Sequence, residues 1–179
     1  MLNIAATGEA QLSDHSREFD AGQGRIRPGQ ATVVVALDGS GDCDTLQEAI
    51  KRIPAAGGMI YIKEGVYEIK QLILLNKNNI GIIGAGKATR INFSSAAAGL
   101  EIGANYVTLS DLYFNGTGSA VTGLITTTSG SYNVFRNLWV EDSPGSGIYF
   151  SSAGVGARVE SCSIVDSGDY SILIDDSDK

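Results

Sequence analysis

The chain has 179 residues, enough for one domain with a buried core, and its 43% hydrophobic content excludes an intrinsically disordered protein. A formal net charge of −7 argues against binding nucleic acid through its phosphates. No run approaches the roughly 18 consecutive apolar residues of a membrane-spanning helix, and the N-terminus lacks the basic and apolar regions of a Sec signal peptide, so neither is predicted.

Residues 1–37 are predicted to form a polar, glycine-rich arm that ends in an entry strand. Pro28 and Gly29 have the order of a type II turn, so a hairpin or an entry strand is expected around them. His15 is the only histidine of the chain, which excludes a site with several histidine ligands.

Residues 45–53 are predicted to form an amphipathic helix. Thr45 followed three positions later by Glu48 is a capping box, and Pro54 ends the segment. One face of this helix is apolar and comprises Leu46, Ala49, Ile50 and Ile53. Such a helix can cover the open first coil of a repeat structure, so it is interpreted as a cap on a domain spanning residues 38–179.

Residues 99–174 contain a phrase that recurs every 24 residues. It begins at Gly99, Gly123, Gly147 and Ser171. A second phrase with nearly the same period runs through Leu109, Phe135 and Val159. A fixed period of this size indicates a repeat architecture. The repeat predicts columns of equivalent core residues, which are Leu100, Leu124, Ile148 and Ile172; Ile102, Thr126, Phe150 and Ile174; and Leu112, Leu138 and Cys162.

The phrases alternate apolar and other residues at period two, which is typical of short strands that are buried on one side. Glycine, serine, asparagine and aspartate separate them. An all-β parallel β-helix, a solenoid with coils of about 24 residues, satisfies this pattern because each coil buries its apolar side against the next. A leucine-rich repeat would need several fixed leucines per repeat, a propeller blade about 40 residues, and a β-sandwich would not keep the period.

Several motifs near the start of the domain resemble those of a known superfamily. They are Asp38-Gly39-Ser40-Gly41-Asp42, the helix that begins at Thr45, the segment from Tyr61 to Glu68, and Ile82-Ile83-Gly84-Ala85-Gly86 with Thr89 and Ile91. They closely resemble the N-terminal cap and first coils of the pectin-lyase-like superfamily, which includes pectin methylesterases, polysaccharide lyases and epimerases, and bacteriophage tailspikes. The resemblance implies a right-handed parallel β-helix over about residues 33–175. Its sharp motifs cover only 38–91 and specify the fold rather than the reaction.

Residues 24 apart are neighbours in such a stack, which places Asp142 beside Asp166. Two stacked carboxylates can share a proton, so this pair with Arg136 as a basic partner is a candidate catalytic set. With Asp169 the pair is also a candidate calcium site, and no other cofactor is expected. The alternative is that both aspartates cap turns. Candidate carbohydrate-binding residues are Trp139, Tyr149, Tyr113 and Arg158.

The catalytic sets of the resembled families are incomplete in this chain. No glutamine follows Gln71 and no histidine follows His15, so neither the esterase set nor the histidine-dependent hydrolase set is present. No C-terminal cap is visible after Ile174. The main expectation is therefore a non-catalytic tailspike-like or tail-fibre-like module, a homotrimer on a virion tail or otherwise extracellular, that recognises a cell-surface polysaccharide. The alternatives are a polysaccharide lyase, epimerase or hydrolase, and a purely structural β-helix fragment.

Overall fold

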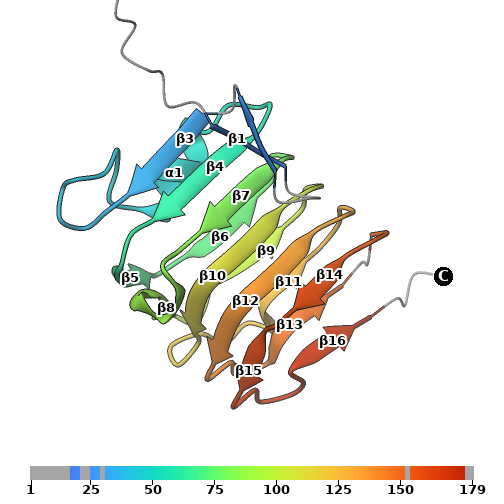
Figure 1. Cartoon of the computed structure of the whole chain (residues 1–179). Coiled ribbons are helices and arrows are strands. Elements are labelled where there is room, and N and C mark those ends of the chain that lie inside the picture. Colours follow the sequence, from blue (N-terminus) through green and yellow to red (C-terminus); the bar gives the residue numbers. More distant parts are fainter. Residues whose placement is uncertain (1–16, 21–24, 29–30, 152–153, 176–179) are drawn as a thin grey trace, which may run out of the picture.

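Short parallel strands stack coil upon coil in the computed structural model, which describes residues 17–20, 25–28, 31–151 and 154–175. The stack is a parallel β-solenoid of about 6 turns with one α-helix near its N-terminal end (Figure 1). This confirms the predicted all-β parallel β-helix with a capping helix.

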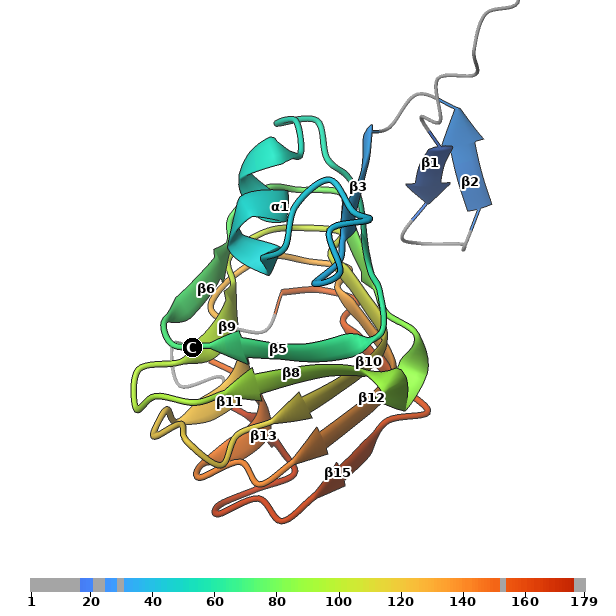
Figure 2. The same cartoon turned by 90° about the vertical axis from the view of Figure 1, so that its left-hand side faces the viewer.

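Three faces surround the core (Figure 2). The first face contains β3 (Ala31–Val35), β4 (Gly58–Ile62), β7 (Ile80–Ile83), the first halves of β10 (Thr108–Asn115) and β12 (Val134–Glu141), and β14 (Arg158–Glu160). The second face contains β5 (Gly65–Ile69), β8 (Thr89–Phe93), the second halves of β10 and β12, and β15 (Ser163–Val165). The third face contains β6 (Leu72–Leu75), β9 (Gly99–Ile102), β11 (Gly123–Thr127), β13 (Ser146–Phe150) and β16 (Ile172–Ile174).

The long strands β10 and β12 serve two faces because each bends at a residue with left-handed backbone. Asp111 has φ 55° and Asn137 has φ 50°, and Ser161 occupies the corresponding place in the next coil with φ 52°. Aspartate and asparagine tolerate this conformation better than most residues. The Asn137 Nδ2 also donates a hydrogen bond of 3.2 Å to Asp111 Oδ1, which ties the two bends together.

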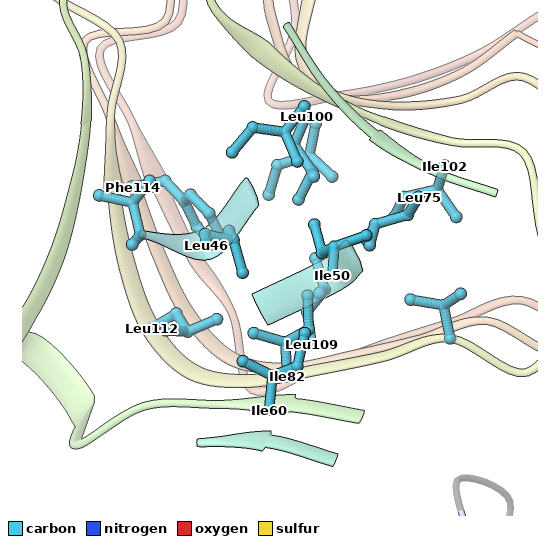
Figure 3. Packing of buried hydrophobic residues seen from close by; sticks show 14 of the residues in the cluster. Leu46, Ile50, Ile60, Leu75, Ile82, Leu100, Ile102, Leu109, Leu112 and Phe114 are labelled. Carbon is cyan, nitrogen blue, oxygen red and sulfur yellow. The ribbon is translucent and has the colours of Figure 1, made fainter. Parts of the chain in front are cut away.

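The core consists of columns of apolar side chains inside the solenoid (Figure 3). Leu109 pairs in register with Phe135, and Phe135 with Val159, as the repeat predicts. Leu112 pairs with Leu138, and Cys162 of the next coil is half-buried against the core. These predicted columns are confirmed.

The predicted register of the third face is wrong at β11. Ile125, not Leu124, pairs with Leu100 of β9, and Thr127, not Thr126, pairs with Ile102. The sequence Gly123-Leu-Ile-Thr-Thr offers two apolar residues followed by two threonines, so alternation fits either register. A shift of one residue exchanges the buried and exposed sides, and it turns Thr126 outward.

The helix α1 (Leu46–Arg52) covers the N-terminal end of the solenoid, with Leu46 and Ile50 directed into the core (Figure 3). The Thr45 hydroxyl accepts the backbone N–H of Glu48, which confirms the predicted cap. At the other helix end, the Lys77 ammonium donates to the carbonyls of Ile50 and Ile53 at 2.8 and 2.7 Å. A cation at this position satisfies carbonyls that have no partner within the helix.

The N-terminal segments differ in part from the prediction. The hairpin is formed by β1 (Arg17–Asp20) and β2 (Arg25–Pro28), whereas Gly29 and His15 lie outside the described residues. The predicted entry strand is present as β3. It pairs in parallel with β4, so the residues from Ala31 onward belong to the stack, whereas the sequence predicts that the arm extends to residue 37.

The last described coil is less covered than the others. Ile172 and Ile174 occupy inward positions of the third face, yet they are 41% and 65% exposed. No helix in the described part of the chain is long and apolar enough to cross a membrane.

Candidate functional site

The third face carries an open groove of about 440 Å³ on its outer side, here called the sheet groove. Its floor comes from the outward residues of β9, β11 and β13, and the segment before β11 forms one side. The lining residues are Leu72, Leu100, Glu101, Ala120, Val121, Thr122, Gly123, Thr126, Thr128, Tyr149 and Ser151.

Tyr149 is the aromatic residue of the sheet groove, and its position depends on Gly123. A Cβ atom at Gly123 would lie 2.4 Å from the Tyr149 Cβ and 2.8 Å from the Thr126 Oγ1, so the tyrosine stands where only glycine leaves room. The Tyr149 hydroxyl donates a hydrogen bond of 3.3 Å to Asp175 Oδ2. Desolvation and, after it, the Asp175 carboxylate raise the pKa of this phenol, which therefore stays a neutral donor around pH 7.

Hydroxyl groups and one carboxylate complete the sheet groove. The Thr126 hydroxyl donates to the Gly123 carbonyl at 2.9 Å, and the Thr128 hydroxyl lies 3.4 Å from Glu101 Oε1 as a donor. The Ser151 hydroxyl donates to the Thr127 carbonyl at 3.1 Å. Because each hydroxyl keeps its acceptor lone pairs, the groove offers acceptors and one carboxylate beside an aromatic ring. This chemistry suits the hydroxyl groups and apolar faces of sugar rings.

The predicted catalytic aspartates lie on the border of the second face. Asp142 and Asp166 occupy equivalent left-handed turn positions in successive coils, with φ 54° and 53°. Asp142 Oδ2 accepts hydrogen bonds from Asn115 Nδ2 at 2.7 Å and from Thr117 Oγ1 at 3.2 Å. The register of Glu141 with Val165 places the two aspartates in neighbouring coils, as predicted. The Asp142 carboxylate is held by side chains of the preceding coil. The role of the two aspartates in catalysis stays a prediction.

Arg136 is not brought to these aspartates. It lies in the first half of β12, where it pairs with Ser110 and Glu160 on the first face. The bend at Asn137 separates that half of the strand from the half that leads to Asp142. Sequence spacing alone could not reveal this because the bend changes the face without interrupting the strand.

The described residues include no group of three or more His, Cys, Asp or Glu side chains placed to hold a metal ion. The predicted calcium set of Asp142, Asp166 and Asp169 is therefore not assembled. The Asp142 carboxylate accepts hydrogen bonds from Asn115 and Thr117 of the preceding coil.

The predicted carbohydrate-binding residues fall on different faces. Tyr113 and Trp139 are register partners on the second face, Tyr149 lies in the sheet groove, and Arg158 is exposed in β14 on the first face. Sequence reasoning did not single out Glu101. Glu101 lies between the core residues Leu100 and Ile102 in the 24-residue phrase, so alternation along the strand marks it as outward-facing.

Comparison with known proteins places these features in a family context. The family model for pectinesterase matches residues 32–120. A pectinesterase/pectinesterase inhibitor of Brassica campestris is 38% identical over 89 residues, which cover 48% of this chain and 15% of the relative. Pectinesterase 5 of Arabidopsis thaliana is 43% identical over 86 residues, covering 46% of this chain and 14% of the relative. The chain thus spans about a seventh of the length of these relatives.

A solved structure, the Agl-KA catalytic domain, shares the fold with a TM-score of 0.55 and 21% sequence identity over 83% of this chain and 35% of that one. The fold and the family match together bear out the resemblance to the pectin-lyase-like superfamily of parallel β-helices. Within that superfamily, the cap and first coils are similar to those of plant pectinesterases. These similarities favour the alternative prediction, a polysaccharide-acting protein. They do not support the main prediction of a tailspike or tail-fibre module on a virion.

Proposed function

We propose that this chain is a polysaccharide-acting β-helix that binds a pectin-type polysaccharide along the sheet groove. The observation that carries the proposal is the groove itself, on a domain whose residues 32–120 match the pectinesterase family model. The substrate class comes from the relatives, whose names describe enzymes that act on pectin.

The form of the groove supports an extended polymer as its ligand. Glu101, Thr126 and Tyr149 are register partners on β9, β11 and β13, so they form one row across three coils. Neighbouring strands lie about 4.8 Å apart, so the row spans roughly 10 Å. That length accommodates more than one sugar unit, and the side of the groove formed by residues 120–123 would keep the chain aligned with the row.

Catalysis is a second candidate function, favoured by the pectinesterase match. Glu101 is the only acidic residue among those lining the groove, so it is the carboxylate best placed to transfer a proton to a bound sugar. Glu101→Gln should abolish any release of methanol or of reducing ends from pectin. Asp142→Asn is the matched control, because Asp142 lies outside the groove. Loss of turnover in the Asp142 variant alone would instead support the predicted Asp142 and Asp166 pair.

Binding is tested by titrating pectin oligosaccharides into the chain by calorimetry. Tyr149→Ala removes the aromatic ring, and Gly123→Ala displaces that ring without changing a polar group. Both variants should weaken binding roughly tenfold, since stacking of a ring on a sugar contributes about 1–2 kcal/mol on the scale of other aromatic contacts. Tyr106→Ala, an exposed tyrosine outside the groove, is the control. Equal affinity in all four proteins would contradict the proposal.

A pectin-type substrate also implies an extracellular site of action. The homotrimer expected from sequence remains a prediction, and light scattering on the purified chain is its direct test.

A further inference from the structure

The second face carries two cations stacked on two aromatic rings, a cluster here called the platform and made of Lys87, Arg90, Tyr113 and Trp139. Tyr113 and Trp139 are register partners on β10 and β12, and Arg90 of β8 is the partner of Tyr113 on the other side. The Arg90 guanidinium carbon lies 4.3 Å from the centre of the Tyr113 ring. The Lys87 Nζ lies 5.2 Å from the centre of the Trp139 ring.

The short helix that carries Lys87, η1 (Gly86–Ala88), is held in place by the buried Thr89. The Thr89 hydroxyl accepts the backbone N–H of Ala85 at 2.8 Å and lies 3.1 Å from the carbonyls of Ile62 and Lys63. These bonds link the loop to two strands of the stack. The backbone that carries the cation above Trp139 is thus anchored to the stack.

Both cations are exposed, and neither forms an ion pair with an acidic side chain in the part of the chain that the structure describes. The carboxylates of the same face are engaged with neutral groups instead. Glu141 accepts the Tyr113 hydroxyl at 2.5 Å, and Glu68 accepts Asn92 Nδ2 at 2.9 Å. In a protein with a net charge of −7, two positive charges are therefore left available next to apolar ring surface.

We propose that the platform is a second carbohydrate site, specific for uronate units, whose carboxylates pair with Arg90 and Lys87. Arginine binds a carboxylate through two parallel N–H bonds, and lysine binds it as a point charge. The two cations stand over strands of successive coils, so an acidic chain that crosses the strands meets them in turn. The half-buried Trp139 ring lies beneath Lys87 and the Tyr113 ring beneath Arg90, so the rings hold both cations on the outer side of the face.

This inference rests on the proposed function for the polysaccharide class and adds the ionic state of the sugar that is bound. Methyl esterification removes the carboxylate charge, so the platform should distinguish unesterified from esterified oligogalacturonate, whereas the groove hydroxyls need not. The two sites can be separated in the Tyr149→Ala protein, in which the groove is weakened and the platform is intact.

The test measures the affinity of unesterified and fully methylated oligogalacturonate by calorimetry for the wild type and Tyr149→Ala, each with and without Lys87→Gln/Arg90→Gln. In the Tyr149→Ala background the double variant should weaken binding of the unesterified ligand at least tenfold. In both backgrounds it should leave binding of the methylated ligand unchanged. Lys51→Gln/Lys70→Gln removes the same charge from exposed positions elsewhere and should change neither affinity.

Two results would overturn the inference and leave the groove proposal standing. One is an unchanged affinity of the double variant for the unesterified ligand, and the other is equal affinity of the Tyr149→Ala protein for both ligands. If Tyr149→Ala binds as tightly as wild type while the double variant does not bind, the groove proposal fails and the platform remains. Thermal unfolding of each variant verifies that it is folded, and single Lys87→Gln and Arg90→Gln proteins repeat the test with a smaller change.

Discussion

The second and third faces of the solenoid are built on the same coils, yet their outer sides offer different chemistry. The third face presents a hollow with hydroxyl groups, one tyrosine and one carboxylate. The second face presents aromatic rings covered by two cations, in strands whose carboxylates are already hydrogen-bonded. The inner sides are alike, since both contribute columns of fully buried aliphatic and aromatic residues.

This difference shows how a solenoid separates folding from function. Alternation along each strand sends every second side chain into the core, so the outward positions can change without disturbing the stack. A groove and a charged platform can therefore coexist about the same core. The predictions below test whether the faces share their stability and differ in their binding.

The largest expected effect comes from the shared core. Phe114, directly next to Tyr113 in β10, is buried and stacks on Phe93 with ring centres 6.1 Å apart. Phe114→Ala should lower the free energy of unfolding by about 3–5 kcal/mol, because it removes a large side chain and leaves a cavity. Chemical denaturation measures this change. Tyr113→Phe on the same strand loses only the bond to Glu141, and should cost about 1 kcal/mol. Equal effects of the two variants would contradict the assignment of inner and outer sides.

The next largest effect is the salt dependence of binding, which should differ between the second and third faces. Binding of unesterified oligogalacturonate should weaken several-fold, by about 1 kcal/mol, between 50 and 500 mM NaCl, because exposed charges are screened over a Debye length. Binding of the methylated ligand should hardly change, since hydroxyl contacts carry no net charge. Calorimetry at the two salt concentrations gives both values. A parallel loss for both ligands would mean that the faces do not differ in this way.

A comparable effect on stability is expected at Thr127, which the register places in the core. Its buried hydroxyl has no hydrogen-bond partner among the described residues. Thr127→Val replaces this hydroxyl by a methyl group of similar size and should raise the free energy of unfolding by about 1 kcal/mol. Thr126→Val is the control on the outer side and should be neutral or slightly destabilising, because it loses the bond to Gly123. A stabilising Thr126→Val together with a neutral or destabilising Thr127→Val would instead support the register predicted from the repeat, with Thr126 in the core.

The smallest effect concerns alkaline pH. Burial raises the pKa of Tyr67, whose hydroxyl donates to the carbonyls of Val35 and Lys63. A raised pKa in the folded state means that the neutral phenol is favoured by folding. Its contribution to stability is full below the unfolded pKa of about 10 and declines as pH rises through the higher folded value. Thermal unfolding between pH 8 and 11 should show this decline, and Tyr67→Phe should reduce it.

The sequence allowed the fold to be predicted because its repeat and its cap are local patterns. The capping box at Thr45 and the columns through Leu109 and Leu112 follow from spacing alone, and the structure has them as expected. The register of β11 could not be predicted, because Leu124 and Ile125 satisfy the same alternation. In the structure Ile125 pairs with Leu100, and Leu124 is fully buried as well.

The sites were predicted less well, for a related reason. The 24-residue spacing placed Asp142 beside Asp166, since the two lie at equivalent places in successive coils. It did not pair Tyr113 with Trp139, which are 26 residues apart and are register partners in the structure. It could not show that the bend at Asn137 turns Arg136 onto another face. Nor could it place Lys87, which reaches Trp139 from the short helix η1, outside the 24-residue period.

The most direct measurement of the central claim is a titration of the isotopically labelled chain with pectin oligosaccharide, followed by backbone NMR. The account predicts that signals of Glu101, Thr126 and Tyr149 shift for both esterified and unesterified ligands. Those of Lys87, Arg90 and Trp139 should shift only for the unesterified one. Shifts confined to the first face, around Arg136 and Arg158, or no shifts at all, would contradict it.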